Sequence, residues 1–534
     1  MIKKLKRSIG YRYTRLCQNR RIRAIAAEVA QDYKKNEQGN PKNPVLLFNA
    51  STRLIGLSQN AAFSLLTHWA LKECGIPAVQ LVCRTGMQPC VLGTIADDPE
   101  KMPPCAKCMR LSDAVYAHMD VRALVYLPQG QMALDDLSVS QLAEYQHGDF
   151  PVGAIVLPSI RWILRRHNLL ENDGTRTLFA RYIHSAISLL TQFEKILDET
   201  QPRAVVVFNG MFFPEATLKW AAQKRGIQVI SHEVALRPMT AFFTPGEATA
   251  YPIELPADYQ LNQQQNERLD AYLANRMQGD FSMAGVRFWS GMKGLDASIL
   301  EKAAQYKGII PVFTNVIFDT SQGHANVLFG TMFDWLDSVA ELIRAHPEHL
   351  FILRAHPDEV RPGKASQESV ADWVDHKNLL NYPNVLFIPA EEPFSSYEMI
   401  QRAKFVMVYN STIGLEASIL GAAVVCAGKA RFTQTECVYF PKSLADYSNL
   451  VSTFLTADHI QAPELHKANA RNFLYAQLFE TSLPMETFLE NDPYLAGYTG
   501  FKDFHAADLR PENSETMRII TDGILKGEPF LWQP

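Results

Sequence analysis

The sequence lacks any apolar run long enough to cross a bilayer as a helix, which takes about 20 residues. It also lacks low-complexity tracts and any internal repeat of the length typical of solenoid proteins. No apolar core of a signal peptide follows the first basic residues. These absences exclude a chain that spans a membrane and a solenoid, and we expect a protein that is not exported.

The chain also lacks a strong charge of either sign. Its 52 Lys and Arg residues nearly balance 56 Asp and Glu residues, for a net charge of -4. A general nucleic-acid partner is therefore excluded, because such binding needs a dominant basic surface to displace phosphate counterions. With 47% hydrophobic and 20% charged residues, the composition is that of a globular protein with large cores.

Cysteine is scarce, with eight residues in the chain, so a disulfide framework is excluded and a reducing, cytoplasmic location is expected. Four cysteines are nevertheless close in sequence: Cys83, Cys90, Cys105 and Cys108. The last two have the two-residue spacing that lets a pair of thiolates reach one metal ion. A structural zinc site, a redox pair and unconnected surface thiols are the three interpretations that the spacing leaves open.

The one local excess of charge is at the start of the chain. Residues 1–23 contain nine basic and no acidic residues: Lys3, Lys4, Lys6, Arg7, Arg12, Arg15, Arg20, Arg21 and Arg23. We interpret residues 1–35 as a basic arm or helix. It either packs on the first domain with a solvated face or binds an anionic membrane surface, where each basic residue contributes about 1 kcal/mol.

Residues 36–290 show the alternation of buried strands and helices that is typical of a parallel sheet covered on both faces. Strands are expected at 45–51, 78–83, 123–127, 153–157 and 204–208, and helices at 59–73 and 176–200. This alternation predicts a Rossmann-like amino-terminal domain, which we assign to the acceptor.

Polar residues follow two of these strands. Asn209 and Gly210 end the strand at 204–208, and a short strand at 228–230 is expected to deliver Ser231, His232 and Glu233 to the same edge. Glu233 is either a simple loop carboxylate or the acceptor-binding group and catalytic base. His232 is the weaker candidate.

A second alternating region covers residues 291–460. Strands are expected at 308–319, 350–354, 385–388, 405–409 and 423–427, with helices at 332–344, 395–402 and 412–420. We predict a second Rossmann-like domain that binds the donor, and we expect residues 461–534 to be mainly helices that return to the first domain. The fold class is α/β, with two domains facing each other across a cleft.

Two polar clusters follow strands of the second domain. In the first, Arg354 precedes His356, and Pro357 fixes the backbone after it by locking φ. An imidazole held there can donate a hydrogen bond to a phosphate oxygen. A His-Pro dipeptide alone is common, so this interpretation depends on the second cluster.

The second cluster begins with Asn410, Ser411 and Thr412, where a strand becomes a helix. Backbone N–H groups, hydroxyls and a helix amino terminus can neutralise a phosphate in a partly dry cleft. Gly414 would let the ligand approach closely, and Glu416 would accept hydrogen bonds from ribose hydroxyls. The alternative is a helix capped by Thr412 with no ligand.

Four motifs resemble those of bacterial capsule polysaccharide biosynthesis glycosyltransferases, the group that includes capsule Kdo transferases: TNVIFD (314–319), DWL (334–336), LRAHPDE (353–359) and NSTIGLEASILGAAVV (410–425). The resemblance covers most of residues 45–455 and implies the GT-B architecture. In related enzymes that use CMP-sugars, the His-Pro and Ser/Thr motifs hold the nucleotide. Those roles fall here on His356, Pro357, Ser411 and Thr412, with Asn315 on the donor side and Glu416 in the place of a ribose-binding carboxylate.

The resemblance implies transfer of a sugar from a nucleotide-activated donor to a capsular or lipid-linked acceptor. A CMP-sugar such as CMP-Kdo is favoured, and a UDP-sugar is the second choice. His356 and Glu233 are the expected catalytic residues, and no metal cofactor is expected for catalysis because no Asp-x-Asp motif lies at the expected cleft.

The alternatives are a glycerophosphotransferase, a sugar epimerase, or a non-catalytic nucleotide- or glycan-binding subunit of a capsule assembly complex. A peripheral position on the inner membrane fits the basic arm.

Overall fold

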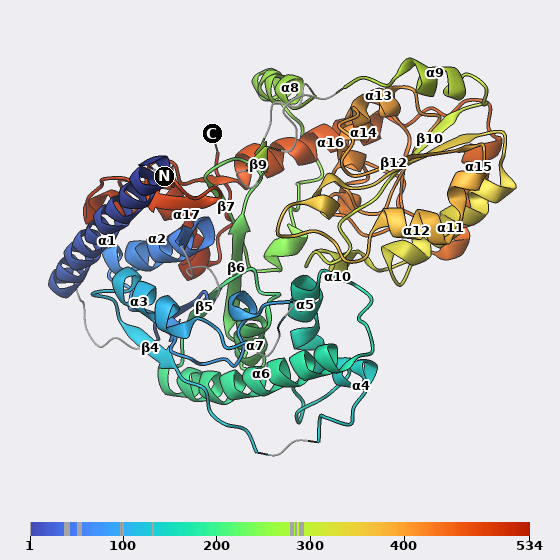
Figure 1. Cartoon of the computed structure of the whole chain (residues 1–534). Coiled ribbons are helices and arrows are strands. Elements are labelled where there is room, and N and C mark those ends of the chain that lie inside the picture. The colour runs from blue at the N-terminus through green and yellow to red at the C-terminus, as the bar shows by residue number, and fades with distance from the viewer. Residues whose placement is uncertain are drawn as a thin grey trace.

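A computed structural model gives the arrangement of the chain as two α/β domains (Figure 1). It describes residues 2–36, 43–50, 56–96, 98, 101–130, 133–277, 282–283, 286–287 and 293–533. Each domain contains its own sheet, and the predicted α/β class is confirmed. Two Rossmann-like domains with a pocket between them form the GT-B arrangement.

The first domain is built on a seven-stranded sheet in the order β15-β7-β6-β5-β1-β3-β4. The strands from β6 to β4 in this order are parallel, whereas β7 and β15 form antiparallel pairs at the other edge. The strands are β1 (Val45–Phe48), β3 (Ala78–Cys83), β4 (Val121–Leu124), β5 (Ala204–Phe208), β6 (Gln228–Val234), β7 (Thr240–Thr244) and β15 (Leu483–Pro484). Every residue of β1 and β5 is buried, as expected of strands covered on both faces.

Helices cover both faces of this sheet. One core contains residues of α1 (Ile2–Asn36), α2 (Gln59–Glu73) and α17 (Glu515–Lys526), and the other contains those of α5 (Val152–Leu164), α6 (Asp173–Thr200) and α7 (Phe213–Gln223). The basic arm is therefore one long helix that packs by its second half on the first domain. Shorter elements complete the domain: α3 (Cys105–Val115), α4 (Val139–Ala143), η1 (Val91–Gly93) and η2 (Ala248–Ala250).

The strand predicted at 153–157 is wrong, because these residues lie in α5. In so short a segment, a continuous run of apolar residues shows neither the period of a strand nor that of a helix. In the full helix, buried Val152, Val156, Ile160 and Ile163 recur three or four residues apart. The strand predicted at 228–230 is too short, since β6 continues to Val234 by pairing with β7.

The second domain has a five-stranded, all-parallel sheet in the order β12-β11-β10-β13-β14. Its strands are β10 (Ile309–Phe313), β11 (Leu350–Arg354), β12 (Val385–Ile388), β13 (Val406–Val408) and β14 (Val424–Cys426). Its helices are α9 (Ala297–Ala303), α10 (Gln322–Ala325), α11 (Met332–Ala345), α12 (Val370–His376), α13 (Ser396–Gln401), α14 (Ile413–Ile419) and α15 (Leu444–Thr456). Short 3-10 turns lie at η3 (Pro357–Val360), η4 (Leu379–Asn381) and η5 (Thr433–Thr435).

Two segments connect the domains. On the way out, α8 (Gln263–Met277) and the strands β8 (Ser282–Met283) and β9 (Val286–Arg287) follow the first sheet. On the way back, α16 (Glu464–Tyr475) and a π-helical turn (Ala476–Glu480) lead to β15 in the first sheet (Figure 1). The chain thus returns to the first domain, as the sequence predicts.

The prediction that residues 461–534 are mainly helical is only partly correct. Besides α16 and α17, this segment contributes β15, β16 (Leu489–Asn491) and β17 (Tyr498–Phe501), and β17 pairs with β2 (Leu57–Ser58). These strands are too short for an alternating pattern to show. Over the part of the chain that is described, no helix combines the length and apolarity needed to cross a membrane.

Candidate functional site

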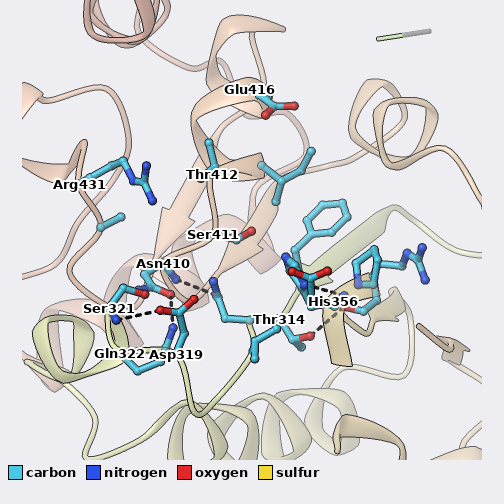
Figure 2. A pocket seen from close by; sticks show the side chains of 18 of the residues that line it. Thr314, Asp319, Ser321, Gln322, His356, Asn410, Ser411, Thr412, Glu416 and Arg431 are labelled. Carbon is cyan, nitrogen blue, oxygen red and sulfur yellow. Dashed lines mark hydrogen bonds between the residues drawn. The ribbon is translucent and has the colours of Figure 1, made fainter. Parts of the chain in front are cut away.

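A cavity of about 360 Å³ lies at the carboxyl edge of the second sheet and reaches the first domain at Thr249 and Ala250. Ligands of open α/β sheets bind in such a crevice beyond the strand ends. The structure brings all the predicted donor residues except Gly414 to its wall: Asn315, Arg354, His356, Pro357, Asn410, Ser411, Thr412 and Glu416. In Figure 2, Arg431 and His356 lie on opposite sides of Ser411.

His356 presents one ring nitrogen to the protein. Its Nδ1 accepts a hydrogen bond from the backbone N–H of Asp358 at 3.1 Å. Burial lowers the pKa of this imidazole, so the ring is neutral at neutral pH and carries its proton on Nε2. A neutral imidazole in this tautomer is a hydrogen-bond donor, which matches the role predicted for His356.

Arg354 also lies at the wall, but its guanidinium is used within the protein. It donates to the carbonyl of Pro389 and, at 2.7 Å, to that of Glu392. The side chain is buried, and burial lowers the pKa of Arg354 to about 10. Arg354 thus ties the end of β11 to the loop after β12 and shapes the cavity.

A chain of amide hydrogen bonds fixes the start of the second cluster. Asn315 Oδ1 accepts from the backbone N–H of Asn410 at 3.3 Å, and the Asn410 Oδ1 accepts from Gln322 at 3.3 Å (Figure 2). The Asn315 backbone N–H in turn lies 3.1 Å from the Met332 sulfur. The loops after β10 and β13 are therefore held together, with Ser411 and Thr412 facing the cavity between them.

The structure contradicts one alternative and one prediction about the following helix. Thr412 occupies the cap position of α14, but its side chain makes no capping hydrogen bond and lines the cavity instead. Gly414 does not line the cavity: a Cβ added there would lie 2.9 Å from the Val408 side chain. This glycine allows α14 to pack closely on β13 and does not serve the approach of a ligand.

Glu416 lines the cavity but already has strong partners. Its Oε1 accepts from Arg276 Nε at 2.9 Å and Nη2 at 2.6 Å, and its Oε2 accepts from Tyr397 at 2.5 Å. The ion pair is almost completely buried. Arg276 lies in α8, far from Glu416 in the chain, and sequence analysis missed it.

Sequence analysis also missed two cations of the loop after β14. Lys429 and Arg431 line the cavity. The Arg431 guanidinium lies 4.2 Å from the centre of the Tyr251 ring, in the geometry of a cation–π contact, and burial lowers the pKa of Arg431. The signal was present in the sequence as a short basic segment after a buried strand, GKAR at 428–431.

Glu233 lies beside this cavity in the first domain and not in its wall. Its carboxylate accepts hydrogen bonds from Asn60 at 2.7 Å and from Asn209 at 2.9 Å. Burial raises the pKa of Glu233, these hydrogen bonds oppose the shift, and the charge of Asp319 adds to it. Asp319 belongs to the second domain and does line the cavity, so a carboxylate of one domain acts electrostatically on Glu233 of the other.

The turn predicted at Asn209 and Gly210 is present. Asn209 has a φ of 58° and Gly210 has a φ of 79°, both in the left-handed region. The Asn209 Oδ1 accepts from the Met211 backbone N–H at 3.0 Å while its amide holds Glu233. His232, by contrast, is buried among aromatic rings with its pKa lowered to about 3 by burial, and it has no place in the site.

The four clustered cysteines line a separate, smaller cavity at the carboxyl end of β3. Cys90, Cys105 and Cys108 are free thiols, and Cys83 Sγ accepts a hydrogen bond from the backbone N–H of Gly86 at 3.3 Å. Among the described residues, no group of three or more His, Cys, Asp or Glu side chains is arranged to hold one metal ion. The zinc interpretation thus stays a prediction, without a preformed site for a single ion.

Comparison with known proteins finds a family model that matches part of the chain. Residues 289–478 match the model of a family described as capsule polysaccharide biosynthesis protein. The match includes the whole five-stranded sheet and both polar clusters of the cavity. It confirms the family resemblance that the sequence motifs indicate.

A curated relative, Protein FixF of Sinorhizobium fredii (strain NBRC 101917 / NGR234), is 25% identical over 242 residues, which is 44% of this chain and 50% of FixF. This chain thus spans about half the length of that relative. Similar solved structures include the β-Kdo 2,4-transferase KpsC of Thermosulfurimonas dismutans (12% identity, 56% of this chain and 84% of that chain, TM-score 0.34). Another is the UDP-GlcNAc 2-epimerase of Neisseria meningitidis bound to UDP-GlcNAc (12% identity, 82% of this chain and 99% of that chain, TM-score 0.22).

Proposed function

We propose that this chain, whose residues 289–478 match the capsule polysaccharide biosynthesis protein model, is a glycosyltransferase that takes a sugar from a nucleotide-activated donor. The second domain would bind the donor and the first domain the glycan acceptor. The observation that carries the proposal is the cavity at the edge of the second sheet, where neutral donors and cations converge.

The cavity provides what a nucleotide phosphate needs. His356 offers Nε2–H, Ser411 and Thr412 offer hydroxyls, and Lys429 and Arg431 offer positive charge. Placed at the edge of a partly buried cleft, these groups would neutralise the charge that develops on the phosphate as the sugar leaves. In this proposal Glu416 and Arg276 act indirectly, by holding α8 against α14.

Glu233 is the proposed general base. Its pKa is raised and two asparagines hold it in one orientation, and a carboxylate with a raised pKa is better matched to neutral pH than an ordinary surface carboxylate. It would take the proton from the acceptor hydroxyl as that oxygen attacks the anomeric carbon, while the bond from the sugar to the nucleotide phosphate breaks. Asp319 is the alternative base on the donor side.

The favoured donor is a CMP-sugar, with CMP-Kdo as the first choice. A panel of CMP, CDP, UDP and GDP in a thermal-shift assay tests this, because a nucleotide that binds the native state raises the apparent stability. We expect the largest rise in Tm with CMP. A preference for UDP would contradict the Kdo assignment and leave nucleotide-sugar transfer in place.

Transfer itself is tested with two variants that separate binding from chemistry. His356→Ala is expected to reduce both the CMP-induced rise in Tm and the transfer rate, whereas Glu233→Gln should lower the rate by about 100-fold or more and leave the rise unchanged. His459→Ala, an exposed histidine of the same domain, is the control. Near-normal transfer by both site variants would overturn the assignment, and conversion of donor without transfer would indicate an epimerase.

The acceptor is proposed to be lipid-linked or part of a surface polysaccharide, reached at the cytoplasmic face of the inner membrane. The first half of α1 supports this. One of its faces presents exposed Ile9, Tyr13 and Leu16 beside exposed Arg12 and Arg20. Exposed apolar side chains flanked by arginines are typical of a helix that lies on an anionic bilayer surface.

A further inference from the structure

Two cations from different domains lie beside one tryptophan ring. The Arg165 guanidinium, at the carboxyl end of α5 in the first domain, lies 4.1 Å from the centre of the Trp162 ring. The Lys364 ammonium, in the loop between η3 and α12 of the second domain, lies 5.8 Å from the centre of the same ring. Two like charges are thus held near each other where the domains meet, which costs free energy unless an anion compensates them.

Arg165 has a hydrogen-bond donor without an acceptor. Its guanidinium also lies 5.0 Å from the centre of the Phe318 ring, so an aromatic ring of each domain holds it in place. Its Nη1 atom is buried, and in the described part of the chain no group accepts a hydrogen bond from it. A buried N–H without an acceptor costs free energy. The acceptors that fit the edge of a guanidinium best are the oxygens of a carboxylate or a phosphate.

Carboxylates of the protein compensate these charges only in part. Among the described residues, none lies within ion-pair distance of Arg165 or Lys364. A third cation, Arg361, is paired with Asp358 at 3.7 Å. Burial, and then the charges of Arg361 and Arg165, lower the pKa of Lys364, and the charges of Asp358 and Asp319 oppose this shift. Three cations against two carboxylates leave an excess of positive charge at the junction.

The position suits a ligand that comes from solution. Lys364 is exposed and Arg165 is only partly buried, so an ion can reach both. Asp319 and Asp358 also line the cavity of the second sheet, which places the cations beside that cavity. We propose that Arg165 and Lys364, with Arg361, bind an oxyanion that bridges the two domains. The ligand is a carboxylate carried by an acidic glycan or free phosphate, since both offer oxygens to a guanidinium and an ammonium.

The test titrates the full chain with inorganic phosphate and with trigalacturonate by isothermal calorimetry, with maltotriose as the neutral glycan. Low salt is used because salt screens exposed charges. We expect saturable binding of at least one of the two anions and none of maltotriose. Binding of phosphate alone would support a free-phosphate site, and binding of trigalacturonate alone a site for glycan carboxylates. Binding of neither anion would overturn the proposal, and so would equal binding of maltotriose and trigalacturonate.

Variants separate this site from the cavity of the second sheet. The double change Arg165→Gln and Lys364→Gln is expected to weaken binding by roughly 10-fold or more, whereas Arg431→Gln, in that cavity, should retain it. Lys364→Gln alone changes an exposed side chain and should weaken binding even where the double variant fails to fold. The matched control, Arg122→Gln with Lys195→Gln, replaces two exposed cations elsewhere and should bind as the unchanged chain does.

Equal weakening in the site and control variants would overturn the assignment to Arg165 and Lys364, and so would loss of binding in Arg431→Gln alone. None of these measurements depends on sugar transfer. A negative result therefore leaves the proposed function in place, and a positive result stands even if no sugar is transferred.

Discussion

Arg276 and Glu416 form an ion pair whose side chains are 9% and 3% exposed. Removing one partner leaves the other charge buried and uncompensated. We expect Arg276→Met to lower the free energy of unfolding by roughly 3–5 kcal/mol, and the addition of Glu416→Gln to restore most of it. Denaturant unfolding measures both. The control is Lys195→Met, which breaks an exposed pair with Glu199 and should cost less than about 1 kcal/mol.

Equal stability of Arg276→Met and the control would show that the pair is solvated in solution. The pair also marks a limit of sequence analysis at this scale. Glu416 could be proposed as a site residue because it follows a strand and a polar cluster. Its partner could not, because α8 has the pattern of a polar surface helix and only the tertiary fold brings position 276 to position 416.

Glu359 is a buried carboxyl group immediately beyond the His356 loop. Burial raises its pKa to about 8 from 4.5, so the folded state holds a proton that the unfolded state releases between these values. The stability that this group contributes is then greatest below pH 4.5 and is lost as pH rises towards 8, at no more than about 1.4 kcal/mol per pH unit. We expect the difference in unfolding free energy between the unchanged chain and Glu359→Gln to follow this slope.

Glu301→Gln, at an exposed position of α9, is the matched control for that experiment and should leave the pH profile unchanged. The measurement is urea unfolding at a series of pH values from about 5 to about 9. A profile of Glu359→Gln that parallels the unchanged chain throughout would show that Glu359 is ionised in the folded state. In that case a cation near the His356 loop would have to compensate the negative charge of Glu359.

The arginines of helix α1 point in two directions, some towards the protein and some towards solvent. Arg15 and Arg21 face the protein, where they pair with Asp492 at 3.4 Å and Asp503 at 2.6 Å. Arg12, Arg20 and Arg23 are exposed and recur on one face with Ile9, Tyr13 and Leu16. The alternatives that the sequence left open are therefore compatible: the second half of α1 packs on the domain, and its first half presents an open face. The contributions of Lys3, Lys4, Lys6 and Arg7 lie outside the described side chains.

Membrane binding by this face is testable without any substrate. Replacing Arg12, Arg20 and Arg23 by Gln removes about 1 kcal/mol of attraction per residue, so binding to vesicles rich in phosphatidylglycerol should weaken by roughly 100-fold. Flotation measures the bound fraction, with phosphatidylcholine vesicles as the neutral reference. The control replaces three exposed basic residues elsewhere, Arg122, Lys195 and Lys467, and is expected to bind as the unchanged chain does. Equal loss in both variants would assign the effect to overall charge.

The sequence predicts those elements that have a continuous apolar run or a clear hydrophobic period. The parallel strands and the long helix α6 follow from continuous apolar runs and a clear helical stripe. The helix α5 was missed because a short apolar run cannot distinguish a buried strand from a buried helix. Register and edge pairing could not be predicted either, since β15 and β7 are brought together only by the return of α16.

For the whole molecule, the sequence predicts two domains and a site between them, but not what holds the domains in their relative position. Glu368 of the second domain forms part of the contact between the two domains. Its carboxylate accepts hydrogen bonds from the backbone N–H groups of His167 at 3.0 Å and Asn168 at 3.1 Å in the first domain. The adjacent Gln367 N–H donates to the Arg165 carbonyl at 2.9 Å, and the Arg165 guanidinium lies 5.0 Å from the centre of the Phe318 ring in the second domain.

Glu368→Ala is expected to loosen this contact and increase the mean separation of the domains. Loss of charge-assisted hydrogen bonds worth about 2 kcal/mol would shift the balance between closed and open arrangements by roughly 30-fold. Small-angle scattering should show a larger radius of gyration than for the unchanged chain, with Glu391→Ala, an exposed carboxylate of the same domain, as the control. Because the first domain contributes few residues to the proposed donor cavity, the expected CMP-induced rise in Tm should persist while transfer slows. An unchanged radius with unchanged transfer would show that other contacts hold the domains.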